Sequence, residues 1–278
     1  MIQIQDLNFS YRKKTQLFNG LNLQSDTGRI YGLLGKNGAG KTTLLKLMAG
    51  LLHPRGGEIR MNGYNSSRRH PGHLATYYMM PEEFMAPAIS VNTFLKINAP
   101  FYPNFDRKQF FDYLEQFELR NRGKISRFSY GQKKKFFLSF GLAANTPVFI
   151  ADEPTNGLDI PSKSIFRRIV ASALTDERLF IISTHQVRDI EGLPDTLAVI
   201  EDGKIIFNET VDEISRKLVF TVLDEDELER SDVLYSESAL GGSECIVENT
   251  DERFTKPNTE LLFNALISKE SKVAALFS

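Results

Sequence analysis

The first 80 residues alternate short apolar runs with turn signals. Segment 2–9 alternates apolar and polar positions, and segment 29–34 is a continuous apolar run that predicts a short buried strand. Residues 43–49 then repeat apolar positions at helical spacing, with Gly50 placed to end the helix. Turns are predicted at Gly28, Gly56-Gly57 and Asn62-Gly63.

From about residue 90 to 140 the apolar spacing becomes helical, and the many phenylalanines of this stretch are expected in a core. Strand-like runs return at 148–151, 179–182 and 197–200, with an amphipathic helix predicted over 164–174. Strands that alternate with helices predict a mostly parallel sheet.

The last 60 residues have a different pattern and a different charge. Before them, a final strand is predicted at 204–207 and a helix at 211–218; within them, strands are predicted at 219–223, 233–236 and 244–247, and a helix at 259–268. Residues 219–278 hold 13 acidic and 5 basic side chains, a balance of −8, so the preceding residues carry +7 of the net −1. We therefore predict a small acidic α+β module that begins near Lys217.

The composition limits the class of protein. The 278 residues, 41% apolar and 25% charged, suit one large globular domain or one domain with a small appendage. No apolar run is long enough to cross a bilayer, and the N-terminus has no apolar signal-peptide core. Cys245 is the only cysteine, which excludes an internal disulfide. We expect a cytoplasmic protein.

A phosphate-binding loop lies between the predicted strand at 29–34 and the helix that follows. Residues 35–42 match G-x-x-x-x-G-K-[ST] at every fixed position. The glycines let successive backbone N–H groups point at phosphate oxygens, at a helix start that adds positive partial charge. Lys41 is expected to reach the terminal phosphates of a nucleotide triphosphate, and the Thr42 hydroxyl to bind Mg²⁺. The predicted nucleotide-binding residues are Gly35, Lys36, Asn37, Gly38, Ala39, Gly40, Lys41, Thr42 and Thr43.

Two later strands end in polar groups. Asp152 and Glu153 follow the apolar run 148–151, at a strand end beside the phosphate loop, where ligand chemistry occurs in a parallel sheet. Asp152 is expected to hold Mg²⁺ directly or through water, and Glu153 to act as the general base for water. His185 follows the run 179–182 and could donate to a γ-phosphate, although a single histidine at a strand end is usually structural.

Two further segments have both a structural and a functional interpretation. Asp159 follows a Gly-Leu turn and is best explained as a helix N-cap. Ser129, Gly131 and Gln132 precede an apolar helix and three lysines. They form either a second anion site at a helix start or a Ser-capped helix with a solvated lysine face.

These segments together resemble the ATP-binding subunit of an ATP-binding cassette (ABC) transporter, over about Met1 to Leu218. Residues 35–42 match Walker A, and residues 148–155 match Walker B. Residues 156–159 match the D-loop, which includes Asp159, and 183–185 match the H-loop, which includes His185. Residues 128–132 resemble the LSGGQ signature. Tyr11 stands where the family stacks an aromatic ring on adenine.

The resemblance implies an α/β fold of the P-loop NTPase type, with a mixed sheet core, an antiparallel β subdomain and a helical subdomain. The nucleotide-binding domain would span 1–218, with the helical insert at about 84–145, and the accessory module would span 219–278. In two places the sequence departs from the family. Tyr130 replaces the first signature glycine, and Glu82 replaces the Q-loop glutamine. A carboxylate at Glu82 can still help to bind Mg²⁺, and a solvated loop Glu is the alternative.

The function that the resemblance implies is ATP hydrolysis, with Mg²⁺, that drives export through separate membrane permease subunits. Two ABC subunits, identical or different, would pair head to tail, so that residues 129–132 of one contact the ATP of the other. The protein would lie on the inner face of the cell membrane. One alternative is a soluble ABC-type switch that acts on nucleic acid or ribosomes, although nucleic acid is an unlikely partner for a single cassette without a coiled coil. The other is a regulatory or dimerising tail.

Overall fold

A six-stranded sheet forms the centre of the molecule. The computed structural model describes residues 1–12, 15–68, 70–83, 85–120, 123–230, 232–268 and 271–277. The strand order is β10-β9-β3-β8-β7-β6, and all neighbours are parallel except β9 and β10. The bounds are β3 (Arg29–Leu34), β6 (Tyr77–Met80), β7 (Val148–Asp152), β8 (Leu179–Thr184), β9 (Thr196–Glu201) and β10 (Lys204–Thr210). The predicted parallel sheet is confirmed.

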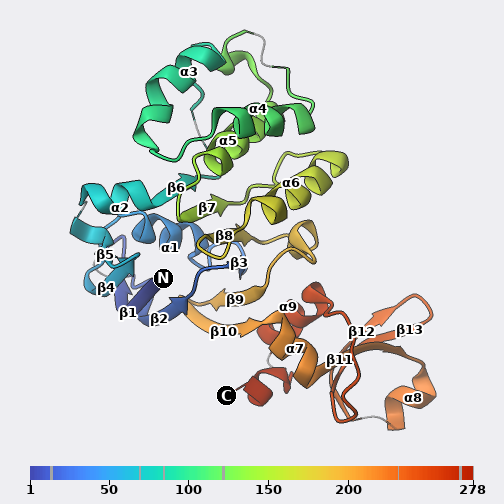
Figure 1. The fold of residues 1–278 in the computed structure, drawn as a ribbon. Helices are drawn as coiled ribbons and strands as arrows, with labels where there is room; N and C mark the ends of the chain where they lie inside the picture. The colour runs from blue at the N-terminus through green and yellow to red at the C-terminus, as the bar shows by residue number, and fades with distance from the viewer. Residues whose placement is uncertain are drawn as a thin grey trace.

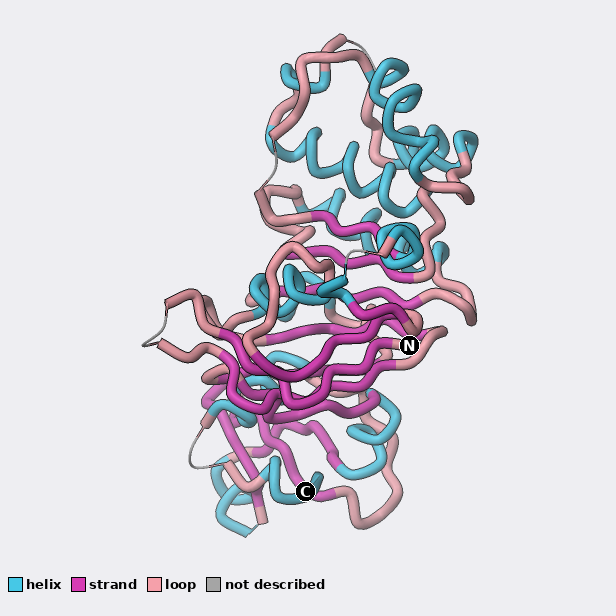
Figure 2. Tube along the Cα trace, turned by 90° about the vertical axis from the view of Figure 1, so that its left-hand side faces the viewer, coloured by secondary structure: helices cyan, strands magenta, loops and turns pink. Residues whose placement is uncertain are grey.

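A second, antiparallel sheet comes from the first 65 residues, in the order β2-β1-β4-β5. Its bounds are β1 (Ile2–Phe9), β2 (Phe18–Ser25), β4 (Gly56–Met61) and β5 (Tyr64–Asn65). One hydrophobic core joins this sheet, helix α1 (Lys41–Met48) and one face of the central sheet. Figure 2 shows the strands stacked in layers below the helical part.

The other face of the central sheet is covered by helices, which lie mainly at the top of Figure 1. Alternate residues of β7 and β8 point to the two cores, as in a strand that is buried on both faces. Ser90 and Asp106 cap two of these helices through Thr93 N and Gln109 N. The bounds of these helices are α3 (Val91–Asn98), α4 (Arg107–Gln116), α5 (Tyr130–Ala143) and α6 (Ile160–Ala173), whereas α2 (Pro71–Thr76) lies beside β5 and the end of α1. Short 3₁₀ turns are η1 (Ser66–Arg68), η2 (Ala99–Phe101), η3 (Ile125–Arg127), η4 (Val187–Ile190) and η5 (Val273–Phe277).

The predicted core role of the phenylalanines between residues 90 and 140 is confirmed for its central members. Phe94, Phe110, Phe136 and Phe140 are buried and contact one another through edge-on rings. Phe84, at the expected start of the helical insert, lies outside the described residues.

The C-terminal part forms a three-stranded antiparallel sheet of order β11-β13-β12, at the lower right of Figure 1. The elements are α7 (Val211–Lys217), β11 (Leu218–Leu223), α8 (Glu225–Arg230), β12 (Val233–Ala239), β13 (Gly242–Glu248) and α9 (Thr259–Ile267). Helix α8 has no counterpart among the elements expected from the sequence. Because Ile214, Ile246 and Leu261 share one core with the central sheet, the boundary at residue 218 stays a prediction.

Within the described part of the chain, every helix is too short or too polar to span a lipid bilayer.

Candidate functional site

The loop between β3 and α1 is a tight turn that needs its glycines. Gly40 has a φ of 107° and a Cβ there would lie 2.8 Å from the Phe18 ring. A Cβ on Gly35 would lie 2.6 Å from the Ile200 carbonyl oxygen. The backbone can therefore turn onto the helix start only without side chains at these two positions.

Lys41, the first residue of α1, is buried within the loop. Its ammonium group donates to the carbonyl oxygens of Gly35, at 2.7 Å, and Lys36, at 3.2 Å. It also lies 3.7 Å from Glu153 Oε1. Burial lowers the pKa of Lys41 below its usual value, and the Glu153 and Asp152 carboxylates oppose that shift. The loop thus holds a desolvated cation beside the carboxylates of β7.

A cavity of about 750 Å³ opens on this cation, within the range of ligand pockets. Residues of the loop line it together with Glu82, Glu153 and His185. Tyr11 stands at the cavity with its side chain 61% exposed, and its hydroxyl is 3.0 Å from Thr43 Oγ1. The aromatic ring is therefore accessible to a ligand that enters the cavity, while stacking on adenine stays a prediction.

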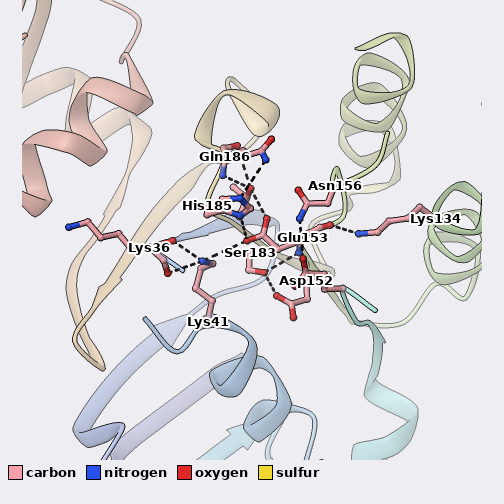
Figure 3. Close-up of polar contacts among 12 residues, drawn as sticks. Lys36, Lys41, Lys134, Asp152, Glu153, Asn156, Ser183, His185 and Gln186 are labelled. Atoms are coloured by element: carbon pink, nitrogen blue, oxygen red, sulfur yellow. Dashed lines mark hydrogen bonds and ion pairs between the residues drawn. The ribbon is translucent and has the colours of Figure 1, made fainter. Parts of the chain in front are cut away.

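Neighbouring strands β7 and β8 bring the acidic residues and the histidine together, as Figure 3 shows. Ser183 Oγ donates to Asp152 Oδ1 at 2.6 Å. Asp152 is fully buried, and its second oxygen, Oδ2, has no hydrogen-bond partner in the described structure. A buried carboxylate oxygen of this kind is costly unless another group, such as a cation, binds it.

Glu153 lies at the centre of the site. Its Oε2 accepts from Thr184 Oγ1 at 3.1 Å, and its Oε1 lies 2.8 Å from His185 Nδ1. Its backbone has a φ of 45°, a left-handed conformation that costs a non-glycine residue on the order of 1 kcal/mol or more. The structure thus holds this carboxylate in one orientation, between Lys41 and His185, despite an unfavourable backbone.

The residues expected to bind Mg²⁺ do not form a complete set of protein ligands by themselves. In the described ranges, no three His, Cys, Asp or Glu side chains gather closely enough to hold a metal ion. Glu82 Oε1 accepts from Asn156 Nδ2 at 3.1 Å. Magnesium commonly uses one or two protein ligands together with substrate phosphates. The unpartnered Asp152 Oδ2 and the Thr42 hydroxyl suit such a shared site.

Residues 129–132 lie apart from the cavity, and none of them lines it. Ser129 and Gln132 form a capping box at the start of α5, with Gln132 N 3.2 Å from Ser129 Oγ and Ser129 N 2.9 Å from Gln132 Oε1. Both side chains are exposed. Of the two interpretations that the sequence leaves open, the helix cap is present, and an exposed helix start remains available to an anion from another molecule.

Tyr130 connects this helix with two loops of the site. Its hydroxyl donates to the Glu82 carbonyl oxygen at 3.2 Å. Its ring lies against Gly157, which has a φ of 78°, and a Cβ on Gly157 would come within 2.5 Å of the ring. Asp159, two residues later, caps α6 by accepting from Ser162 N at 2.9 Å, which confirms the predicted N-cap.

Lys134 is the site residue that sequence reasoning missed. The solvated lysine face considered from the sequence is wrong at this position, because Lys134 is fully buried and its ammonium group donates to the Glu153 carbonyl oxygen. A signal was available: Lys134 lies four, seven and eight residues before Leu138, Gly141 and Leu142, all buried on one face of the helix.

Comparison with known proteins agrees with these motifs. The chain matches the ABC transporter family over residues 18–156. It is 30% identical, over 76% of this chain and 92% of the relative, to the lantibiotic transport ATP-binding protein SrtF of Streptococcus pyogenes. It is 32% identical, over 68% of this chain and 64% of the relative, to the Nod factor export ATP-binding protein I of Burkholderia orbicola.

The fold has solved counterparts. A dimeric structure of a bacterial ABC transporter cassette superposes with a TM-score of 0.67 at 19% identity, over 76% of this chain and 98% of that chain. At that identity the likeness concerns the fold, which confirms the expected cassette architecture. The chain therefore belongs to the ABC transporter family, in which it is an ATP-binding and ATP-hydrolysing subunit.

Proposed function

We propose that this ABC-family ATPase drives export through separate membrane-spanning permease subunits. The observation that carries the proposal is the placement of Glu153 between Lys41 and His185 in one cavity, on a family fold. Two relatives are named for lantibiotic transport and Nod factor export. The exposed start of α5 gives each chain a second site for a partner's nucleotide.

In the proposed reaction, Lys41 binds the terminal phosphates of ATP, and residues 35–43 supply backbone N–H groups to them. Glu153 accepts the proton of the attacking water, while Thr184 and His185 hold its carboxylate in place. His185 also donates to the γ-phosphate in this proposal. Asp152 and Thr42 would hold Mg²⁺, with Glu82 as a further candidate ligand, and the ion would supply positive charge that neutralises the phosphates.

Two copies, or one copy and a related subunit, pair head to tail in this proposal. Residues 129–132 of one chain contact the ATP held by the loop of the other, and Asp159 lies in the adjoining D-loop. The ATP then contacts both subunits, so ATP binding favours the closed dimer. Hydrolysis removes this bridge and lets the dimer open.

The cassette would occupy residues 1–218, with its helical insert at about 84–145, and 219–278 would be an accessory module. The protein would act at the cytoplasmic face of the membrane through its permease partners. The alternative of a switch that acts on nucleic acid is not favoured, because the named relatives are transport proteins.

Affinity purification of Glu153→Gln from detergent-solubilised membranes, with ATP and Mg²⁺, tests the proposal. We expect a multi-span membrane protein to co-elute in stoichiometric amount and to be identified by mass spectrometry. Recovery of a soluble dimer without any membrane partner would instead support the soluble switch.

A further inference from the structure

Lys134 joins the helix that carries the signature residues to the backbone of the expected catalytic base. It lies in α5, about one turn after Gly131, and its ammonium group donates to the Glu153 carbonyl oxygen (Figure 3). Asn156 N lies 3.3 Å from the same oxygen and closes the turn after β7. Both donors therefore stabilise the turn in which Glu153 keeps its φ of 45°.

Nearby carboxylates partly offset the cost of burying the Lys134 ammonium group. Burial lowers the pKa of Lys134 to about 8, and the Glu82, Glu153 and Asp152 carboxylates act against that shift. Tyr130, one turn earlier in α5, has its ring centroid 5.6 Å from Lys134 Nζ and donates to the Glu82 carbonyl oxygen. Two residues of one helix thus contact the Glu82 loop and the Glu153 turn at the same time.

We propose that Lys134 is a positioning residue that makes the geometry of Glu153 depend on where α5 lies, and so couples the two ATP sites of the dimer. The inference rests on the proposed function. There, residues 129–132 of α5 contact the partner's ATP, whereas Glu153 serves the nucleotide of its own chain. Because Lys134 is on the same rigid helix, engagement of the partner's ATP and the orientation of this chain's base change together.

Lys134→Met tests the contact, because it keeps an unbranched apolar side chain of nearly the same length and removes the donor. We expect ATP affinity to stay within about threefold, kcat to fall about tenfold to a hundredfold, and the Hill coefficient for ATP to fall toward 1. Lys134→Gln should recover part of kcat, since its amide can donate to the same carbonyl. Lys133→Met, on the neighbouring residue of α5, is the matched control and should behave as wild type.

Mixed dimers of differently tagged chains separate positioning of Glu153 from damage to the signature helix. In the first dimer, a Lys134→Met chain pairs with a Glu153→Gln chain, so the one working base belongs to the chain that lacks Lys134. In the second, a wild-type chain pairs with a chain that carries both substitutions, so the working base keeps its lysine. We expect only the first dimer to be slow relative to a dimer of wild type and Glu153→Gln.

The opposite pattern, or equal rates in both mixed dimers, would overturn the inference. If Lys134→Met does not fold, the double variant Glu82→Gln/Lys134→Met, which removes both charges, replaces it in the same two dimers. Failure of the proposed function is distinguishable, because the wild-type protein would then recover no membrane partner, whereas failure of this inference changes only the rates of the mixed dimers.

Discussion

Glu153 Oε1 lies near two groups with different expected roles. The Lys41 ammonium, 3.7 Å away, is expected to bind phosphate, and His185 Nδ1, 2.8 Å away, holds the carboxylate in place. Lys41 also donates to carbonyl oxygens of its own loop. Triphosphate oxygens that enter the cavity would compete for Lys41 and leave Glu153 with His185 and Thr184. A single carboxylate can therefore be the partner of a cation in one state and face the attacking water in the next.

The first prediction concerns that carboxylate. Glu153→Gln keeps the shape of the side chain but removes the proton acceptor, so we expect ATP to bind with little change and the hydrolysis rate to fall about a hundredfold or more. Phosphate release and nucleotide binding measured on the same sample check this. Glu177→Gln, at an exposed residue in the turn before β8, is the matched control. Hydrolysis near the wild-type rate would remove Glu153 from the role of base.

The sequence predicts the residues of the site that belong to contiguous motifs. Lys41 and Thr42 end a motif whose spacing is that of a phosphate-binding loop, and Asp152 and Glu153 follow an apolar run. Lys134 could not be assigned in this way, because its partner is a backbone carbonyl 19 residues away that only the folded chain brings near. A lysine run in a sequence has the composition of a solvated surface even when one member is buried.

At the scale of elements, the close approach of α5 to the central sheet depends on Gly141. A Cβ at this position would lie 2.8 Å from the Phe149 ring and closer still to the Tyr78 ring. These two rings are stacked, with centroids 6.1 Å apart, and neither can move without disturbing the core. Glycine is thus retained inside a helix for packing.

We predict that Gly141→Ala destabilises the protein, although alanine is the better helix former. The gain in helix propensity is about 1 kcal/mol, while overpacking of a core costs about 1–3 kcal/mol. Urea unfolding, followed by circular dichroism, should therefore give a lower free energy of unfolding for the variant. A more stable variant would mean that α5 shifts away from β6 and β7 without cost.

Helix α2 gives a prediction about pH. His73 is buried, its Nε2 lies 3.2 Å from the Met48 carbonyl oxygen at the end of α1, and burial lowers its pKa. Below about pH 6.5 the unfolded chain therefore binds a proton that the folded chain resists. The free energy of unfolding should fall as the pH decreases, by at most about 1.4 kcal/mol per pH unit from this group.

Urea unfolding between pH 7.5 and 5 of His73→Asn measures that contribution. The variant should show a flatter acid dependence than wild type, whatever its stability at neutral pH. His53→Asn, at an exposed position, should keep the wild-type slope. If the free energy of unfolding falls equally steeply with decreasing pH in wild type and His73→Asn, groups other than His73 determine the loss of stability in acid.

Most elements could be predicted from the sequence, but their arrangement could not. The runs at 148–151, 179–182 and 197–200 become β7, β8 and β9, and the tail helix predicted at 259–268 is α9. Apolar periodicity reports local structure, whereas strand order depends on which faces pack together. Helix α8 was missed because its acidic sequence, Glu-Asp-Glu-Leu-Glu-Arg, has too few apolar positions to show a helical period.

At the scale of the whole molecule, α9 ties the acidic C-terminal part to the cassette. It packs on β12 and β13 of the tail sheet and on η4 and β9, and η4 begins two residues after His185. Glu260 of α9 also pairs with Arg188 of η4. The tail therefore shares both a core and a surface contact with the segment beside the cavity.

We predict that cassette and tail unfold in one transition. Leu262→Ala removes a side chain of α9 that is 1% exposed, so it should lower the stability of the entire protein by about 2–5 kcal/mol. Leu240→Ala, at a fully exposed turn of the tail, is the matched control and should have little effect. Calorimetry that resolves a separate transition for the tail would contradict this expectation.

The position of β8 has a consequence for how the protein is made. In the sheet β8 lies between β3 and β7, yet it follows both in the chain. During synthesis β3, which precedes Walker A, and β7, which carries Walker B, leave the ribosome before β8. These two strands do not pair with each other in the final sheet, because β8 lies between them. Until residues 179–185 emerge and insert between them, the nascent chain has neither a complete sheet nor His185. The nascent chain therefore carries the phosphate loop, without a completed site to hydrolyse ATP, while the residues between 42 and 185 are made.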